Sequence, residues 1–132
     1  MKNKTFTAAE VGKFGERLCA RLLKKSGCKI LGTNCRIGRL EADIIATNKT
    51  HLIFTEVKTR RCDSNNTSRP SSAVNKDKRN NLIAFARAYI KALPEKHRNK
   101  QIRIDVCEIL LHQDGKKLKL NDINYIENAI SR

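Results

Sequence analysis

Two short apolar segments that follow each other closely constrain the fold of this chain more than any other feature. Residues 39–47 and 52–58 are rich in Ile, Leu and Val, and only the polar residues 48–51 separate them. Apolar runs of this length with a short polar connector are typical of a β-hairpin. A register that pairs Thr47 with Leu52 is the simplest one, and it fixes which side chains face each other across the two strands.

Charged residues occupy matched positions in this predicted hairpin. The register places Asp43 opposite Glu56 and Glu41 opposite Lys58. Directly opposed side chains on one face lie about 5 Å apart, close enough for two carboxylates to share a cation. Glu56 and Lys58 are two residues apart on one strand, so both point to the same face. We therefore expect an acidic pair with a lysine beside it.

The rest of the chain predicts helices and strands around the hairpin. Thr7 and Glu10 form a capping box at the start of a helix over residues 8–25. Further elements are expected as a strand within 28–36, a polar mobile loop over 60–72, a second amphipathic helix over 72–93, strands at 101–112 and 117–120, and a short C-terminal helix from Asn121. Residues 1–6 are expected to be flexible. The order predicts an α/β fold, a mixed sheet flanked by helices, in a single domain over residues 1–132.

Positive charge dominates the composition. The chain carries 28 Lys and Arg against 13 Asp and Glu, a formal net charge of +15. Polyanions are the natural partners of such a surface, and nucleic acid is the first choice because phosphate contacts release condensed counterions. The simplest alternative is that the charged residues only keep the protein soluble, but solubility requires a smaller net charge than +15. Low aromatic content disfavours a single-strand binder built on stacking.

Cysteine usage and hydropathy indicate the compartment. The five cysteines form no CxxC pair and are odd in number, so a disulfide framework or a structural zinc site is not expected. Cys19 and Cys107 have apolar neighbours and are expected in the core. No apolar run approaches a membrane span, and no hydrophobic signal segment follows the first residues. We expect a cytoplasmic protein with no membrane partner.

The acidic pair suggests metal-dependent phosphodiester hydrolysis. Asp43 and Glu56 would hold Mg²⁺ or Mn²⁺, hard cations that prefer oxygen ligands, and Lys58 would orient water or stabilise developing charge. The alternative is that these residues form ordinary surface salt bridges, each contributing at most about 1 kcal/mol. Glu-x-Lys alone is a weak signal. The concentration of three acids on adjoining apolar strands of an acid-poor chain favours the site.

Several short motifs together resemble a known family. They are Gly15-Glu16, Asn34-Cys35-Arg36, Glu41 to Ala46, Phe54 to Arg60, Ala73-Val74 with Lys78, Arg103 to Val106, and Asn128-Ala129. The chain resembles the small bacterial YraN-like proteins of the PD-(D/E)XK nuclease superfamily, which includes restriction-type endonucleases and archaeal Holliday-junction resolvases. The resemblance implies a restriction-endonuclease-like sheet, with Asp43, Glu56 and Lys58 as metal and catalytic residues and Glu16 approaching from the first helix. The chain departs from the family pattern at Leu40, Ala42, Thr55 and Ile104.

Other residues receive secondary roles. Arg36, Arg60, Arg61 and Lys78 are the expected phosphate contacts, because they lie on or near loops and helix starts that flank the proposed centre. Glu41 is expected to support the acidic pair. Asp105 could support a network beneath the site, ligate the metal or pair with Arg103, and the supporting role is favoured. The three histidines lack metal-ligand spacing.

These observations give three functional hypotheses. The first is a magnesium-dependent endonuclease that acts on branched or structured DNA, for which a homodimer with two-fold symmetry would explain paired cuts. The second is a nucleic-acid-binding module on a nuclease fold with little or no hydrolytic activity. The third is a ribosome- or RNA-associated protein whose basic face is only adhesive.

Overall fold

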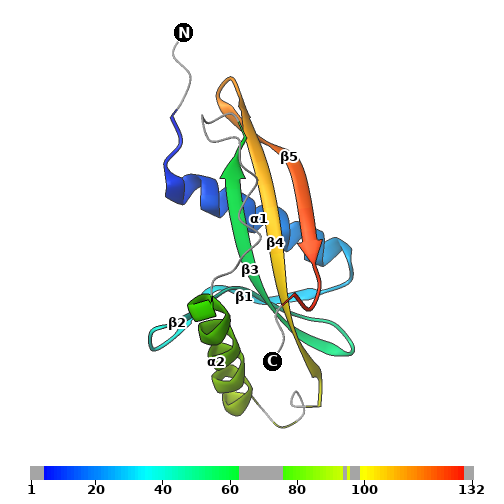
Figure 1. The fold of residues 1–132 in the computed structure, drawn as a ribbon. Helices are drawn as coiled ribbons and strands as arrows, with labels where there is room; N and C mark the ends of the chain where they lie inside the picture. The colour runs from blue at the N-terminus through cyan, green and yellow to red at the C-terminus, as the bar shows by residue number, and fades with distance from the viewer. Residues whose placement is uncertain (1–4, 63–75, 94, 96–98, 130–132) are drawn as a thin grey trace.

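A computed structural model describes residues 5–62, 76–93, 95 and 99–129. Its elements are the helices α1 (Ala8–Lys25) and α2 (Lys76–Ala92) and the strands β1 (Lys29–Ile37), β2 (Leu40–Thr47), β3 (His51–Arg61), β4 (Gln101–Asp114) and β5 (Lys117–Ile126). The strands form one five-stranded sheet in the order β1-β2-β3-β4-β5 (Figure 1). All neighbours are antiparallel except β3 and β4, which are parallel. The predicted α/β class with a mixed sheet is confirmed.

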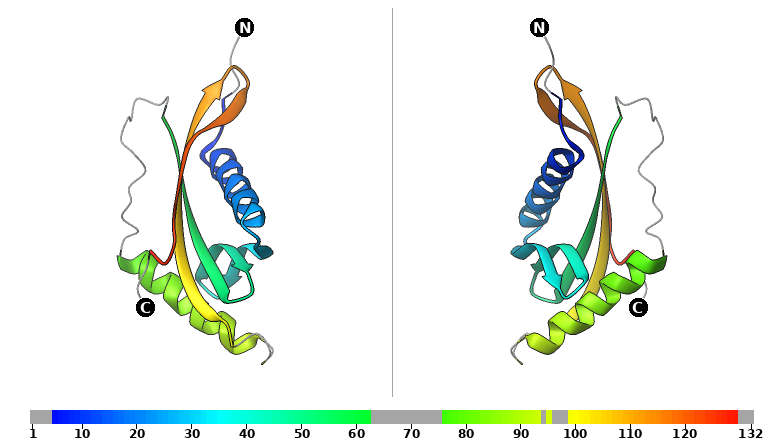
Figure 2. Two further views of the ribbon diagram at one scale, coloured as in Figure 1. Left: turned by 90° about the vertical axis from the view of Figure 1, so that its right-hand side faces the viewer. Right: turned by 90° about the vertical axis from the view of Figure 1, so that its left-hand side faces the viewer.

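The two helices cover opposite faces of the sheet (Figure 2). The parallel pair β3–β4 requires a crossover connection, and α2 lies within it. The α1 face is packed by a cluster that includes Val11, Cys19, Leu23, Ile44, Ile53, Cys107 and Ile109. The α2 face is packed by Ile45, Phe54, Leu82, Phe85, Ile104 and Val106. Burial of Cys19 and Cys107 confirms the core positions expected for them, and all five cysteines are free thiols.

The first helix begins and ends where the sequence predicts. The Thr7 hydroxyl accepts a hydrogen bond from the Glu10 backbone N–H at 3.1 Å, and the Thr7 N–H donates to the Glu10 carboxylate at 3.0 Å. These two bonds form the predicted capping box and satisfy amide groups that have no partner within the helix. Gly27 follows the helix with a φ of 92°, in the left-handed region that favours glycine.

The hairpin has the predicted register but longer strands. Thr47 pairs with Leu52, and Ile44 pairs with Thr55. β3 continues to Arg61, because its other edge pairs with β4 as far as Leu111. The prediction of a loop from Arg60 is therefore wrong for residues 60 and 61. Cys62 lies in a turn, and residues 63–72 of the predicted loop lie outside the described ones.

The predicted C-terminal helix is wrong. Residues 121–126 continue β5, which pairs antiparallel with β4. The pairing shifts between Leu110 and Leu111 of β4, and this shift breaks the alternation of side chains along β5. Even-numbered Leu118 faces the core before the shift, whereas odd-numbered Ile123 and Tyr125 face it afterwards. A bulge of this kind hides the period of two by which a strand is recognised.

Candidate active site

The acidic pair lies where β2 separates from β3. Their ladder ends at Ile44 and Thr55, one step before Asp43 and Glu56 would pair. Beyond this point the Asp43 carboxylate, not a backbone carbonyl of β2, accepts the Val57 backbone N–H at 2.8 Å. This bond holds the Asp43 carboxylate against the backbone of β3 at Val57, the residue between Glu56 and Lys58.

The Asp43 carboxylate is in an unfavourable electrostatic environment. Burial raises its pKa, the negative charges of Glu56 and Glu16 raise it further, and the hydrogen bond from Val57 opposes the shift; the resulting pKa is about 7. Three carboxylates therefore act on one another at this point, although Glu16 comes from a different element. Carboxylates held close together repel one another, and a bound cation would stabilise their ionised forms.

Two lysines supply positive charge to the acidic pair. The Lys78 ammonium, from the first turn of α2, lies 3.3 Å from Glu56 Oε1. The Glu56 side chain is only 15% exposed, so this ion pair is screened less than a surface pair would be. Burial and the charge of Lys78 lower the pKa of Lys58, whereas the charge of Glu56 opposes this shift. Sequence analysis treated Lys78 as a phosphate contact and did not foresee its contact with Glu56.

The charge of Glu16 acts on Asp43 from α1, which approaches β3 closely, although Glu16 itself lines a separate cavity with Thr33 and Asn34. A Cβ atom at Gly15 would lie 2.0 Å from Thr59 Oγ1, so any other residue there requires the Thr59 side chain or the helix to shift. A glycine inside a helix costs about 1 kcal/mol relative to alanine, and its presence is a sequence signal for such an approach. Asn34, which has a φ of 50°, donates a hydrogen bond to the Glu16 carboxylate at 3.0 Å. These roles of Gly15 and Asn34 were not foreseen.

A polar cavity opens at the acidic pair. Its volume is about 190 Å³, and it is lined by Arg39, Glu41, Asp43, Glu56, Lys78, Asn81 and Leu82. The cavity lies between β2, β3 and α2, with carboxylates and cations on its walls. Arg39 and Asn81 are further lining residues that the sequence did not single out. The cavity can admit a charged group such as a phosphate with its hydration water.

The other three basic residues predicted to contact phosphate, Arg36, Arg60 and Arg61, differ in their exposure and in their partners. Arg60 is exposed, and its charge contributes to the lowered pKa of Lys58. Arg61 donates a hydrogen bond to Gln113 at 2.9 Å and so links β3 to β4. Arg36 forms an exposed ion pair with Glu41 at 2.6 Å across the β1–β2 pair. Glu41 therefore faces Arg36, and its predicted position opposite Lys58 is wrong because the β2–β3 ladder ends before it.

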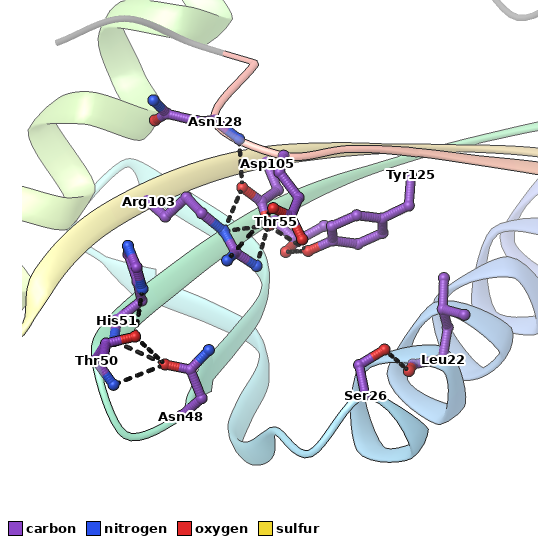
Figure 3. A network of polar contacts seen from close by, with 11 residues as sticks. Leu22, Ser26, Asn48, Thr50, His51, Thr55, Arg103, Asp105, Tyr125 and Asn128 are labelled. Carbon is purple, nitrogen blue, oxygen red and sulfur yellow. Dashed lines mark hydrogen bonds and ion pairs between the residues drawn. The ribbon is translucent and has the colours of Figure 1, made fainter.

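Asp105 is fully buried at the centre of a polar network (Figure 3). Its carboxylate accepts bonds from Arg103 Nε at 3.1 Å, from the Tyr125 hydroxyl at 2.6 Å and from the Asn128 backbone N–H at 2.8 Å. Tyr125 also contacts the Thr55 hydroxyl at 2.9 Å, so the network reaches the residue next to Glu56. Protein donors engage both oxygens of Asp105, and one of them is Arg103, the pairing partner that the sequence also allowed.

The donor set at the acidic pair suits one class of metal. In the part of the chain that the structure describes, no group of three or more His, Cys, Asp or Glu side chains has a geometry that could hold a metal ion. Asp43 and Glu56 supply two carboxylates. Mg²⁺ is commonly held by one or two carboxylates, with waters and substrate phosphates as its other ligands. The residues fit Mg²⁺ or Mn²⁺ in that mode and do not fit a closed structural metal site.

The sequence and fold were compared with those of known proteins. A solved structure of SfsA from Pyrococcus furiosus in complex with Ca²⁺ has a TM-score of 0.42 and 17% sequence identity, covering 83% of this chain and 60% of that one. A UPF0102 protein of Caldanaerobacter subterraneus subsp. tengcongensis is 40% identical over 121 residues, 90% of this chain and 93% of that protein. A UPF0102 protein of Dehalococcoides mccartyi is 35% identical over 127 residues, 95% and 96% of the two chains.

A family profile matches the same region as the candidate site. The profile, described as "Uncharacterised protein family UPF0102", covers residues 15–109. This range begins at Gly15 and includes both strands of the hairpin, α2 and the buried Asp105. It also contains most of the motifs on which the resemblance to YraN-like proteins rests. The chain therefore belongs to the UPF0102 family.

Proposed function

We propose that this protein is a divalent-metal-dependent endonuclease that hydrolyses phosphodiester bonds in DNA, with branched or structured DNA as its substrate class. The observation that carries the proposal is the acidic pair Asp43 and Glu56, which lines a polar cavity in a protein of net charge +15. The charge of Glu56 also acts on Lys58, two residues along the same strand. The raised pKa of Asp43 supports the proposal, because a bound cation would relieve the repulsion between the carboxylates.

Each group at the site has a chemical role in this proposal. Asp43 and Glu56 would hold Mg²⁺ or Mn²⁺, which when bound supplies Lewis-acid polarisation of the phosphate and a more acidic water. Lys58, whose pKa is lowered by burial and by Lys78, would orient the attacking water or stabilise the negative charge that develops on the phosphate. Glu16, held by Asn34, would complete the acidic environment from the α1 side.

Nucleic-acid binding would rest on the basic residues around the cavity. Arg39 and Lys78 line it, and the exposed Arg60 lies on the same strand as Glu56. Such groups contact the phosphate backbone and therefore recognise shape and charge more than base sequence. Arg36 and Arg61 contribute less under this proposal, because neither lines the cavity. A homodimer would match the two-fold symmetry of a branched substrate.

A nucleic-acid-binding module without hydrolytic activity is the second candidate. It is favoured by the contact between Lys78 and Glu56, because an ammonium group already neutralises part of the acidic pair. The scaffold and the basic surface would then serve binding alone, within repair, recombination or uptake machinery. Under either proposal the protein acts in the cytoplasm. No helix among the described residues is both long enough and apolar enough to span a membrane.

Cleavage assays on a panel of substrates test the proposal. Labelled branched, duplex and single-stranded DNA, with an RNA of matched structure, are incubated with Mg²⁺, Mn²⁺ or chelator at one fixed salt concentration. The wild type is compared with Glu56→Gln, and Asp122→Asn on the exposed part of β5 serves as the control for loss of one negative charge. Metal-dependent cutting that Glu56→Gln abolishes supports the endonuclease. Tight binding without cutting supports the second candidate, and a preference for RNA supports an RNA-associated role.

A further inference from the structure

Lys78 occupies an electrostatic position that its own helix does not favour. It lies in the first turn of α2, where the positive end of the helix dipole repels cations; Lys76 and Arg79 add to this repulsion, and Asp77 offsets part of it. The ion pair with Glu56 at 3.3 Å compensates for this repulsion, and the charge of Asp43 also acts on the Lys78 ammonium. The lysine is therefore paired with Glu56 and attracted by the charge of Asp43, the two carboxylates that would hold a metal.

We propose that Lys78 is an internal counter-ion of the acidic pair, which a divalent cation displaces, and that the displaced ammonium then contacts the phosphate of the nucleic acid. The contact between Lys78 and phosphate rests on the proposed function. The displacement of Lys78 concerns only the protein and the cation. Together the two steps would link metal binding to the formation of a phosphate contact.

The geometry allows the displacement with little rearrangement. The Lys78 side chain is 50% exposed, while that of Glu56 is 15% exposed, so the lysine is the partner that can move into solvent. A lysine ammonium sits on a flexible four-carbon stem and can leave the carboxylate while the helix stays in place. A cation with two charges bound by Asp43 and Glu56 would repel both Lys78 and the neighbouring Lys58. Asp43, Glu56 and Lys78 line one cavity, so the displaced ammonium and a phosphate could meet there.

Metal binding by the intact protein tests the first half without any substrate. Mn²⁺ alone is titrated into the wild type and three variants, with the bound ion measured by electron paramagnetic resonance and by calorimetry. Removal of the competing charge in Lys78→Gln is expected to tighten Mn²⁺ binding about threefold to tenfold. Lys76→Gln, which removes the same charge from an exposed position on the same turn, is expected to change the affinity by less than about twofold. Lys78→Arg keeps the ion pair and should bind as the wild type does.

Two results overturn the counter-ion assignment. One is a Lys78→Gln affinity no tighter than that of Lys76→Gln in correctly folded protein, as judged by circular dichroism. The other is failure of Mn²⁺ to bind to the wild type at all. Failure of the nuclease proposal looks different: no substrate is cut, yet Lys78→Gln still binds Mn²⁺ more tightly. In an active enzyme, Lys78→Gln should combine tighter metal binding with slower cleavage, which a merely structural role would not produce.

Discussion

Replacing Asp43 by asparagine should make the metal-free protein more stable while removing its metal site. Asparagine has nearly the shape of aspartate, and its amide oxygen can still accept the Val57 N–H that Asp43 accepts at 2.8 Å. The substitution therefore removes the negative charge and keeps the hydrogen bond. It separates the electrostatic effect of Asp43 from its structural contact.

The magnitude follows from the raised pKa. The pKa of Asp43 is raised from 3.8 to about 7 by burial and by the charges of Glu56 and Glu16, so the folded state binds a proton more tightly than the unfolded state does. The stability that this provides is fully present below about pH 4 and is lost as pH rises through 7. A difference of about three units corresponds to a ceiling of about 4 kcal/mol. Water that enters the adjacent cavity screens the repulsion between the carboxylates, so the expected gain for Asp43→Asn near pH 8 is about 1–2 kcal/mol, well below this ceiling.

Urea denaturation and thermal melting in chelator measure this effect. The variant should melt about 3–8 °C above the wild type near pH 8, and the difference should shrink towards zero near pH 4. Asp122→Asn, an exposed substitution with the same change in net charge, should show no such gain. Added Mg²⁺ should raise the melting temperature of the wild type only. A variant that is less stable than the wild type by the same amount at both pH values would refute the electrostatic argument.

Other predictions concern the supports of the site and its surface. Gly15→Ala should destabilise the protein by about 1–3 kcal/mol in urea denaturation, because its Cβ would overlap Thr59; an unchanged midpoint would contradict the close approach. Tyr125→Phe removes a donor to the buried Asp105 carboxylate and should cost about 1–3 kcal/mol by the same measurement, whereas a neutral effect would show that the network is not stabilising. Arg60→Gln should weaken binding to an uncut DNA duplex and lower the slope of log affinity against log salt by about 1 in fluorescence anisotropy, and an unaltered slope would remove Arg60 from the interface.

Local signals explain which parts of the fold could be predicted. The capping box at Thr7 and Glu10 fixes the start of α1, and the four-residue connector fixes the register of β2 with β3. Both depend on residues that are close in sequence. The extension of β3 to Arg61 depends on pairing with β4, about fifty residues later, and no local pattern encodes it. The extra residue of β5, Asn121, which lies opposite Leu110 and Leu111, likewise hides this strand because it breaks the alternation of inward positions.

The candidate site was partly predictable for the same reason. The register across one hairpin placed Asp43 and Glu56 together, because both belong to adjacent strands. The ion pair between Lys78 and Glu56 requires knowing how α2 crosses the sheet, so the sequence showed only a basic residue on a helix. The expected contact between Glu41 and Lys58 failed because the strands separate after Ile44, and hairpin geometry alone does not reveal where pairing stops.

The parallel pairing of β3 with β4 has a consequence for folding kinetics. Contacts within α1 and within the β1–β2–β3 meander join residues close in sequence, so this half of the chain can form early. His51, however, pairs with Gln101, and closing that long loop is slow. Until β4 is synthesised and docked, β3 presents an unpaired apolar edge, which invites pairing with other chains. The strand that carries Glu56 and Lys58 is thus exposed to such pairing in the nascent protein until β4 covers its edge.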